Sequence, residues 1–283
     1  MLLNNLDESG NMVGKVSETG SRQTGIPAKV PVCLAGHDTQ FAIFGSGAEV
    51  NEPVLSSGTW EILMTRTHQA SSTKEQFDLA ITTELDAVPG IYDIGMNWIG
   101  SGLLEWCSNN LFSELNGDHK YETTISGAEN ISPGSNGVYV SPGFYKESAL
   151  GRGGAIEGLV LGSTRFEIYR VILEALSYRL KDGIAALQKA GQFSTEILRV
   201  VGGGSRNRLW NQIRADVCGV PVQLIDQKET TVLGAALFTF AGIGLFSSVE
   251  AARQNIDYRP VVIEPSENTA IYQCLYQEFK SKQ

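Results

Sequence analysis

Asp38 is the residue in this sequence that is best placed for acid–base chemistry. It stands in the stretch AGHDT, where Gly36 and His37 follow a short apolar run. A carboxylate at a helix start is favoured by the positive end of the helix, and open α/β sheets place reactive groups just beyond their strand ends. The same position suits a plain helix cap, and spacing alone favours that simpler interpretation.

A second group of residues has the chemistry to contact phosphate. Ser56, Ser57, Gly58 and Thr59 form the stretch SSGT between two apolar segments. Small hydroxyl residues beside a glycine close a tight turn and present N–H and O–H groups to an anion. Most such stretches are only turns, so this motif carries little weight alone.

A third motif, VVGGGSRN, covers residues 200–207. A strand that runs into three glycines and then a helix start lets a flat or anionic ligand approach the backbone and meet free helix N–H groups. The dinucleotide pattern G-x-G-x-x-G would need glycine where Asn207 stands, and no Walker P-loop occurs in the sequence. The later stretch ETTVLGAA, residues 229–236, favours a buried helix whose small residues allow close packing.

The elements around these motifs alternate between strands and helices, which predicts an α/β layered fold. Apolar runs and alternation predict strands at 30–35, 55–67 (as a hairpin), 76–85, 91–98, 137–140, 196–201 and 220–225. Helical spacing predicts helices at 39–44, 103–112, 207–218, 230–242 and 267–279, and a long amphipathic helix over about 168–187. Residues 1–28 and 141–163 are expected to be irregular, and 114–136 to hold at most one short helix.

Composition excludes several classes of function. The 283 residues carry a formal charge of −9, so a nucleic-acid or anionic-membrane partner is not expected. The longest apolar stretch, residues 232–246, contains three glycines and is shorter than the about 20 residues that a membrane span needs. No signal peptide and no H-E-x-x-H zinc motif are visible, so we expect a soluble cytoplasmic protein with reduced cysteines.

In this order and spacing the segments resemble the FGGY family of carbohydrate kinases. The resemblance covers about residues 10–260. Its parts are the AGHDT segment with the catalytic aspartate, the second phosphate motif SSGTWEILM, the signature GGAIEGL with RFEIYRVILEALSYRL, the adenosine motif LRVVGGGSRNRLWNQIRADVCGVPVQ, and the following helix ETTVLGAALFTFAGIG. Within the family, residues 36–64 are most similar to the kinases of L-fuculose, and the rhamnulose kinases are the nearest alternative because they share GHDT.

The resemblance implies the two-lobed ATPase fold of the hexokinase–actin superfamily, with ATP and a sugar between the lobes. It implies that Asp38 is the general base and that His37 and Asp38 contact the sugar. Mg²⁺ would be held mostly by ATP phosphates and water, so no protein metal cage is expected. The implied nucleotide contacts are Ser57, Gly58, Thr59, Gly100, Ser101, Gly203, Gly204, Ser205 and Asn207.

The resemblance covers only the second half of such a kinase, because no first phosphate loop of the form D-x-G-[ST] occurs in the sequence. We therefore expect residues 1–48 to be the end of an N-terminal lobe and residues 49–283 to form the C-terminal, nucleotide-binding lobe. The isolated chain is expected to have little or no kinase activity, and the other lobe or a second copy is its expected partner. A nucleotide-binding module without catalysis and a structural protein built on an actin-like lobe stay open as alternatives.

Overall fold

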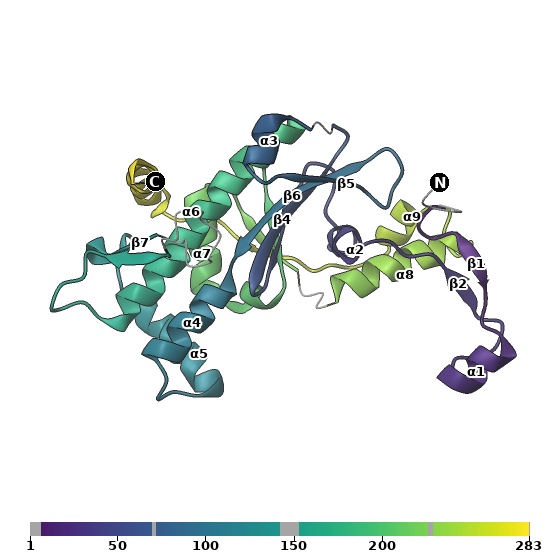
Figure 1. Cartoon of the computed structure of the whole chain (residues 1–283), viewed down its shortest axis with the longest axis horizontal. Coiled ribbons are helices and arrows are strands. Elements are labelled where there is room, and N and C mark those ends of the chain that lie inside the picture. The colour runs from purple at the N-terminus through teal and green to yellow at the C-terminus, as the bar shows by residue number, and fades with distance from the viewer. Residues whose placement is uncertain (1–6, 70–71, 142–152, 226–228, 283) are drawn as a thin grey trace.

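A seven-stranded mixed sheet forms the centre of the molecule (Figure 1). The computed structural model describes residues 7–69, 72–141, 153–225 and 229–282. The strand order is β11-β10-β9-β3-β4-β6-β5; β9 runs parallel to β3 and β10, and the other neighbours are antiparallel. The strands are β3 (Val54–Ser57), β4 (Trp60–Thr67), β5 (Thr82–Leu85), β6 (Tyr92–Ile99), β9 (Leu198–Val201), β10 (Val222–Leu224) and β11 (Val261–Ile263).

Helices cover both faces of this sheet (Figure 1). One layer contains α4 (Ser101–Leu111), α5 (Gly117–Glu129), α6 (Arg165–Gly191), α7 (Arg208–Cys218) and α10 (Thr269–Ser281). The other contains α2 (Asp38–Gly45), α8 (Thr230–Gly242) and α9 (Val249–Arg253). Leu55 and Leu63 belong to the core with α6, whereas their strand neighbours Val54 and Met64 pack with residues of α2. The central strands are therefore buried on both faces, which explains why their sequence does not alternate cleanly.

The long helix α6 begins at Arg165, three residues before the apolar spacing predicted, and is capped by Thr164. Thr164 and Glu167 form a capping box, in which each side chain bonds the backbone of the other residue. The buried residues Ile172, Leu176 and Leu180 recur at helical spacing on the face toward the sheet. The predicted long amphipathic helix is thus confirmed.

A glycine on each helix lets the backbones of α2 and α8 come into direct contact. A Cβ atom on Gly45 would lie 2.0 Å from the carbonyl oxygen of Thr230, and one on Gly234 would lie 2.1 Å from that of Phe41. Only glycine fits at either crossing point. The helix that begins at Asp38 is therefore held directly by α8.

Two small antiparallel sheets lie outside the central one. In one, β1 (Met12–Lys15) pairs with β2 (Pro31–Cys33), and α1 (Glu18–Thr24) connects them. In the other, β7 (Tyr139–Ser141) pairs with β8 (Ala155–Glu157). The prediction of a buried strand at 30–35 is wrong about burial: among the described residues β2 pairs with β1 alone, and Val32 is exposed.

Four other expectations differ from the structure. The first half of the predicted strand 76–85 is instead α3 (Lys74–Asp78), because Thr73 and Gln76 form a capping box. Helix α5 is longer than the short helix expected in 114–136, and residues 1–28 contain β1 and α1. Of the stretch expected to be irregular, 153–163 includes β8, while 142–152 lie outside the described residues.

None of the helices in the part of the chain that the structure describes is long and apolar enough to cross a membrane. The predicted division of the chain after residue 48 stays a prediction.

Candidate active site

Asp38 is the first residue of α2, and its carboxylate is open to ligands. Its side chain is 79% exposed. The Oδ1 atom accepts a hydrogen bond from the backbone N–H of Thr39 at 2.8 Å, and Nε2 of His37 lies 3.5 Å from the same oxygen. His37 is the N-cap residue, although its side chain makes no cap hydrogen bond. The helix start therefore holds the carboxylate in place while leaving it reachable.

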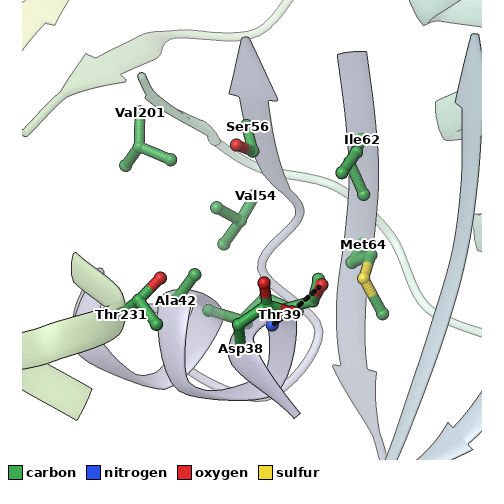
Figure 2. Close-up of a pocket in the computed structure, with 10 residues that line it drawn as sticks. Asp38, Thr39, Ala42, Val54, Ser56, Ile62, Met64, Val201 and Thr231 are labelled. Atoms are coloured by element: carbon green, nitrogen blue, oxygen red, sulfur yellow. Dashed lines mark hydrogen bonds between the residues drawn. The ribbon is translucent and has the colours of Figure 1, made fainter. Parts of the chain in front are cut away.

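A cavity of about 140 Å³ lies beside Asp38 (Figure 2). Hydroxyl residues from three elements line it: Thr39 of α2, Ser56 of β3 and Thr231 of α8. The rest of the lining is apolar and comes from Ala42, Ile43, Val54, Ile62, Met64 and Val201. The Asp38 carboxylate thus borders a small hollow between α2, α8 and the sheet, where a bound group would be partly screened from water.

The SSGT motif ends β3 and forms the turn to β4, and the start of α4 is hydrogen-bonded to that turn. The backbone N–H groups of Gly100 and Ser101 donate to the carbonyl oxygens of Thr59 and Gly58 at 2.9 and 3.0 Å. A Cβ atom on Gly100 would lie 2.5 Å from Cγ of Glu61 and 3.1 Å from the carbonyl oxygen of Gly58. The β3–β4 turn and the start of α4 are about 40 residues apart in the sequence, but they form one structural unit.

The glycine turn after β9 lies against the same hairpin. Gly202 has a φ of 86°, and a Cβ atom on it would lie 2.8 Å from the carbonyl oxygen of Ser57. A Cβ atom on Gly204 would lie 2.1 Å from Oγ of Ser57. Gly203 is exposed, and Ser205 donates its hydroxyl hydrogen to the carbonyl oxygen of Gly202 at 2.7 Å. The glycines thus let two backbone turns approach closely.

Two of the predicted nucleotide contacts have side chains that are engaged inside the protein. Asn207 is buried, caps α7 through the N–H of Trp210 at 3.1 Å, and donates to the hydroxyl of Tyr169 at 3.1 Å. The Ser57 hydroxyl is also buried and accepts a hydrogen bond from Arg214 at 2.7 Å. A ligand here would meet exposed backbone and the Thr59 side chain more readily than these two side chains.

The structure brings the glycine turn and the start of α4 against the β3–β4 turn, and Asp38 lies at the adjoining cavity on α2. In that cavity Asp38 is the only carboxylate among the described lining residues. In the described ranges, no group of three or more His, Cys, Asp and Glu side chains is arranged so that it could hold a metal ion. A single carboxylate at this cavity is compatible with a magnesium ion that phosphates and water would mostly hold.

Sequence reasoning missed a row of buried charges beneath α2. Asp93 of β6 lies opposite Arg66 of β4 and Glu84 of β5. Arg66 pairs with Asp86 at 2.8 Å, with both side chains buried, while neither carboxylate oxygen of Asp93 has a hydrogen-bond partner among the described residues. Burial and the adjacent Asp86 charge raise the pKa of Asp93 to about 8.

This row of charges reaches the start of α2. Oε2 of Glu84 lies 3.8 Å from Nδ1 of His37, and the Arg66 guanidinium lies 5.0 Å from the centre of the Phe44 ring. Charged residues inside otherwise apolar strands, such as Asp93 in IYDIGM, were the sequence signal that this row exists.

Comparison with known proteins identifies the family. The model of the C-terminal domain of the FGGY family of carbohydrate kinases matches residues 54–243. The chain therefore belongs to the FGGY family, and the predicted family and α/β fold are confirmed.

The chain is 45% identical over 247 residues to L-fuculokinase of Haemophilus influenzae, a match that covers 87% of this chain and 52% of the relative. It is 29% identical over 280 residues to rhamnulokinase of Bacteroides thetaiotaomicron, covering 96% of this chain and 56% of the relative. The solved structure of ligand-bound xylulose kinase from Lactobacillus acidophilus matches with a TM-score of 0.85 at 17% identity, covering 99% of this chain and 56% of that one. The chain thus spans about half the length of the relatives it matches, and its fold is the C-terminal lobe of the actin-like ATPases.

Proposed function

We propose that this chain is the nucleotide-binding half of an ATP-dependent sugar kinase that transfers the γ-phosphoryl group to L-fuculose and forms L-fuculose 1-phosphate. The observation that carries the proposal is the meeting of the three predicted nucleotide segments at one turn, with Asp38 across the adjoining cavity. Phosphoryl transfer requires little more than in-line positioning, charge stabilisation and a base near the nucleophile. The choice of sugar is supported by the 45% identity to an L-fuculokinase.

In this proposal each segment has one task. Asp38 takes the proton from the attacking sugar hydroxyl, and His37 helps to orient that sugar. Backbone N–H groups and the Thr59 hydroxyl at the β3–β4 turn bind the phosphates, while the glycine turn receives the adenosine. Bound Mg²⁺ would spread the charge that develops on the phosphates.

Calorimetry with MgADP tests the nucleotide part of the proposal. We expect the chain to bind MgADP, and the Asp38→Asn variant to bind it with the same affinity, because the base contacts the sugar hydroxyl and not the adenosine. A wild-type chain that binds neither MgADP nor MgATP would contradict this and favour a structural protein built on the same fold.

An enzyme-coupled assay of ADP release tests the transfer step. We expect less than about 1 s⁻¹, an ordinary kinase rate, from this chain alone with L-fuculose. Adding the N-terminal half of the Haemophilus influenzae relative should give release that depends on L-fuculose and is lost in Asp38→Asn. A preference for L-rhamnulose in the mixture would replace the proposed substrate, and no release with any ketose would support a nucleotide-binding module without catalysis.

A further inference from the structure

A fully buried ion pair lies behind the β3–β4 turn. Arg214 is on α7, the helix that follows the glycine turn, and Glu61 is the second residue of β4, just after the SSGT motif. Both side chains are 0% exposed and their charged atoms are in contact. None of the predicted site residues belongs to this pair.

The pair is surrounded by specific hydrogen bonds. One terminal nitrogen of Arg214 donates both to Glu61 and to the Ser57 hydroxyl, and the other donates to Oδ1 of Asn211 at 2.9 Å. The second carboxylate oxygen of Glu61 accepts from Nε1 of Trp98 at 2.8 Å. The guanidinium also lies 3.6 Å from the centre of the Trp210 ring. The arginine fork is therefore fixed in direction as well as in position.

These contacts reach all three nucleotide segments. The hairpin is bonded through Ser57, and the glycine turn is bonded through Asn211, whose Nδ2 donates to the carbonyl oxygen of Ser205 at 2.6 Å. The start of α4 is reached through Glu61, because Gly100 packs directly on its Cγ. One buried pair thus connects three segments that come from distant parts of the sequence.

The stability of the fold does not by itself explain why this ion pair is buried. The penalty for removing two charges from water offsets much of their attraction, and well-packed apolar residues of similar volume often stabilise a protein equally well. A planar guanidinium that donates from both terminal nitrogens instead fixes the distance and angle between the groups that it joins. A nucleotide that contacts both turns needs them held within about 0.5 Å of the productive geometry.

We propose that Arg214 and Glu61 are positioning residues that hold the β3–β4 turn and the glycine turn at the separation needed to bind one nucleotide across both. This inference rests on the proposed nucleotide site. It assigns the pair no contact with the ligand and no role in proton transfer.

The test compares Arg214→Met with Arg170→Met. Arg170 is a matched control because it is also buried and pairs with the buried Glu174 at 3.0 Å on α6. Its other guanidinium nitrogens donate to the carbonyl oxygen of Ala128 and the hydroxyl of Tyr272, which are not predicted nucleotide residues. Both variants leave a buried carboxylate without its partner and should be similarly less stable toward urea. Calorimetry should show MgADP binding at least about tenfold weaker in Arg214→Met and within about twofold of wild type in Arg170→Met. Equal losses in the two variants would overturn the proposal.

The double variant Arg214→Met/Glu61→Met separates positioning from stability. Removing both charges should restore much of the resistance to urea, while MgADP binding stays weak because no fork joins the two turns. Recovery of wild-type affinity together with stability would overturn the proposal.

Hydrogen exchange tests the inference without any nucleotide. The amides of Gly58, Gly100 and Ser205 have backbone acceptors in the two turns, and we expect them to exchange faster in Arg214→Met while the amides of α6 keep their protection. Unchanged exchange at these amides would overturn the positioning role. A wild-type chain that fails to bind MgADP would instead overturn the proposed function, so the two failures are distinguishable.

Discussion

Replacing Asp93 by asparagine tests how the buried charges on β4, β5 and β6 control the stability of the fold. Asp93 is fully buried, and its pKa is raised from 3.8 to about 8, first by burial and then by the charge of Asp86. Between these two pH values the folded protein keeps a proton that the unfolded chain releases. Stability therefore falls as pH rises through this window, and the loss ends above the folded-state pKa.

The expected size of the effect follows from this linkage. Within the window, the free energy of unfolding should fall by about 1.4 kcal/mol per pH unit, or about 3 kcal/mol between pH 5 and pH 7. Asparagine has nearly the shape of the neutral acid and can donate a hydrogen bond to Asp86 at every pH. Relative to wild type, Asp93→Asn should therefore gain stability as pH rises from 5 to 7.

Urea unfolding at pH 5, 6, 7 and 8, followed by circular dichroism and extrapolated to water, measures this difference. Asp78→Asn is the control, because it removes a carboxyl that is more than half exposed and pairs with Lys74 on the surface of α3; its curve should stay parallel to wild type. If Asp93→Asn also runs parallel to wild type between pH 5 and pH 7, the buried carboxyl is not protonated in the folded state and the reasoning is refuted.

Three further substitutions test close packing and capping. Gly204→Ala would place a Cβ atom 2.1 Å from Oγ of Ser57. It should therefore destabilise the fold by about 1–3 kcal/mol, measured by urea unfolding, and weaken MgADP binding, measured by calorimetry. Normal affinity for MgADP would contradict the described turn. Gly234→Ala would place a Cβ atom 2.1 Å from the carbonyl oxygen of Phe41. We expect a destabilisation of about 1–3 kcal/mol in the same urea assay. Wild-type stability would show that α2 and α8 pack less closely than the structure describes. Thr164→Ala removes the capping box of α6 and should lower the free energy of unfolding by about 1 kcal/mol; an unchanged urea midpoint would argue against the cap.

Much of the order of helices and strands was readable from the sequence, because local signals define it. The glycines near 58 and 202–204 end strands, and the apolar spacing of α6 marks a long helix. Local signals led to a wrong element where a strand signal and a helix signal overlapped. The apolar residues of 76–85 suggested one strand, but the Thr73–Gln76 capping box starts a helix first. Sheet order could not be read, since the pairing of β3 with β9 joins residues far apart in the chain.

The candidate site was predictable in its backbone and less so in its side chains. Glycine-rich turns reveal where chains approach closely, and these segments do meet at the β3–β4 turn. Whether a serine or asparagine points outward depends on tertiary partners, so the inward direction of Ser57 and Asn207 was not visible. Arg214 and Glu61 look like ordinary surface charges in sequence, and only packing shows that they are buried together.

The close crossing of α2 and α8 has a consequence for how this chain folds during synthesis. Phe41 leaves the ribosome long before Gly234, yet one face of α2 packs closely against α8. Forming that contact requires closure of a loop that contains most of the chain, so it is a slow, late event compared with the packing of α6 on nearby strands. Until then the apolar side of α2, including Phe41 and Phe44, lacks its partner Phe238. The helix that carries the catalytic candidate therefore leaves apolar surface open to aggregation or chaperone binding until α8 has been made.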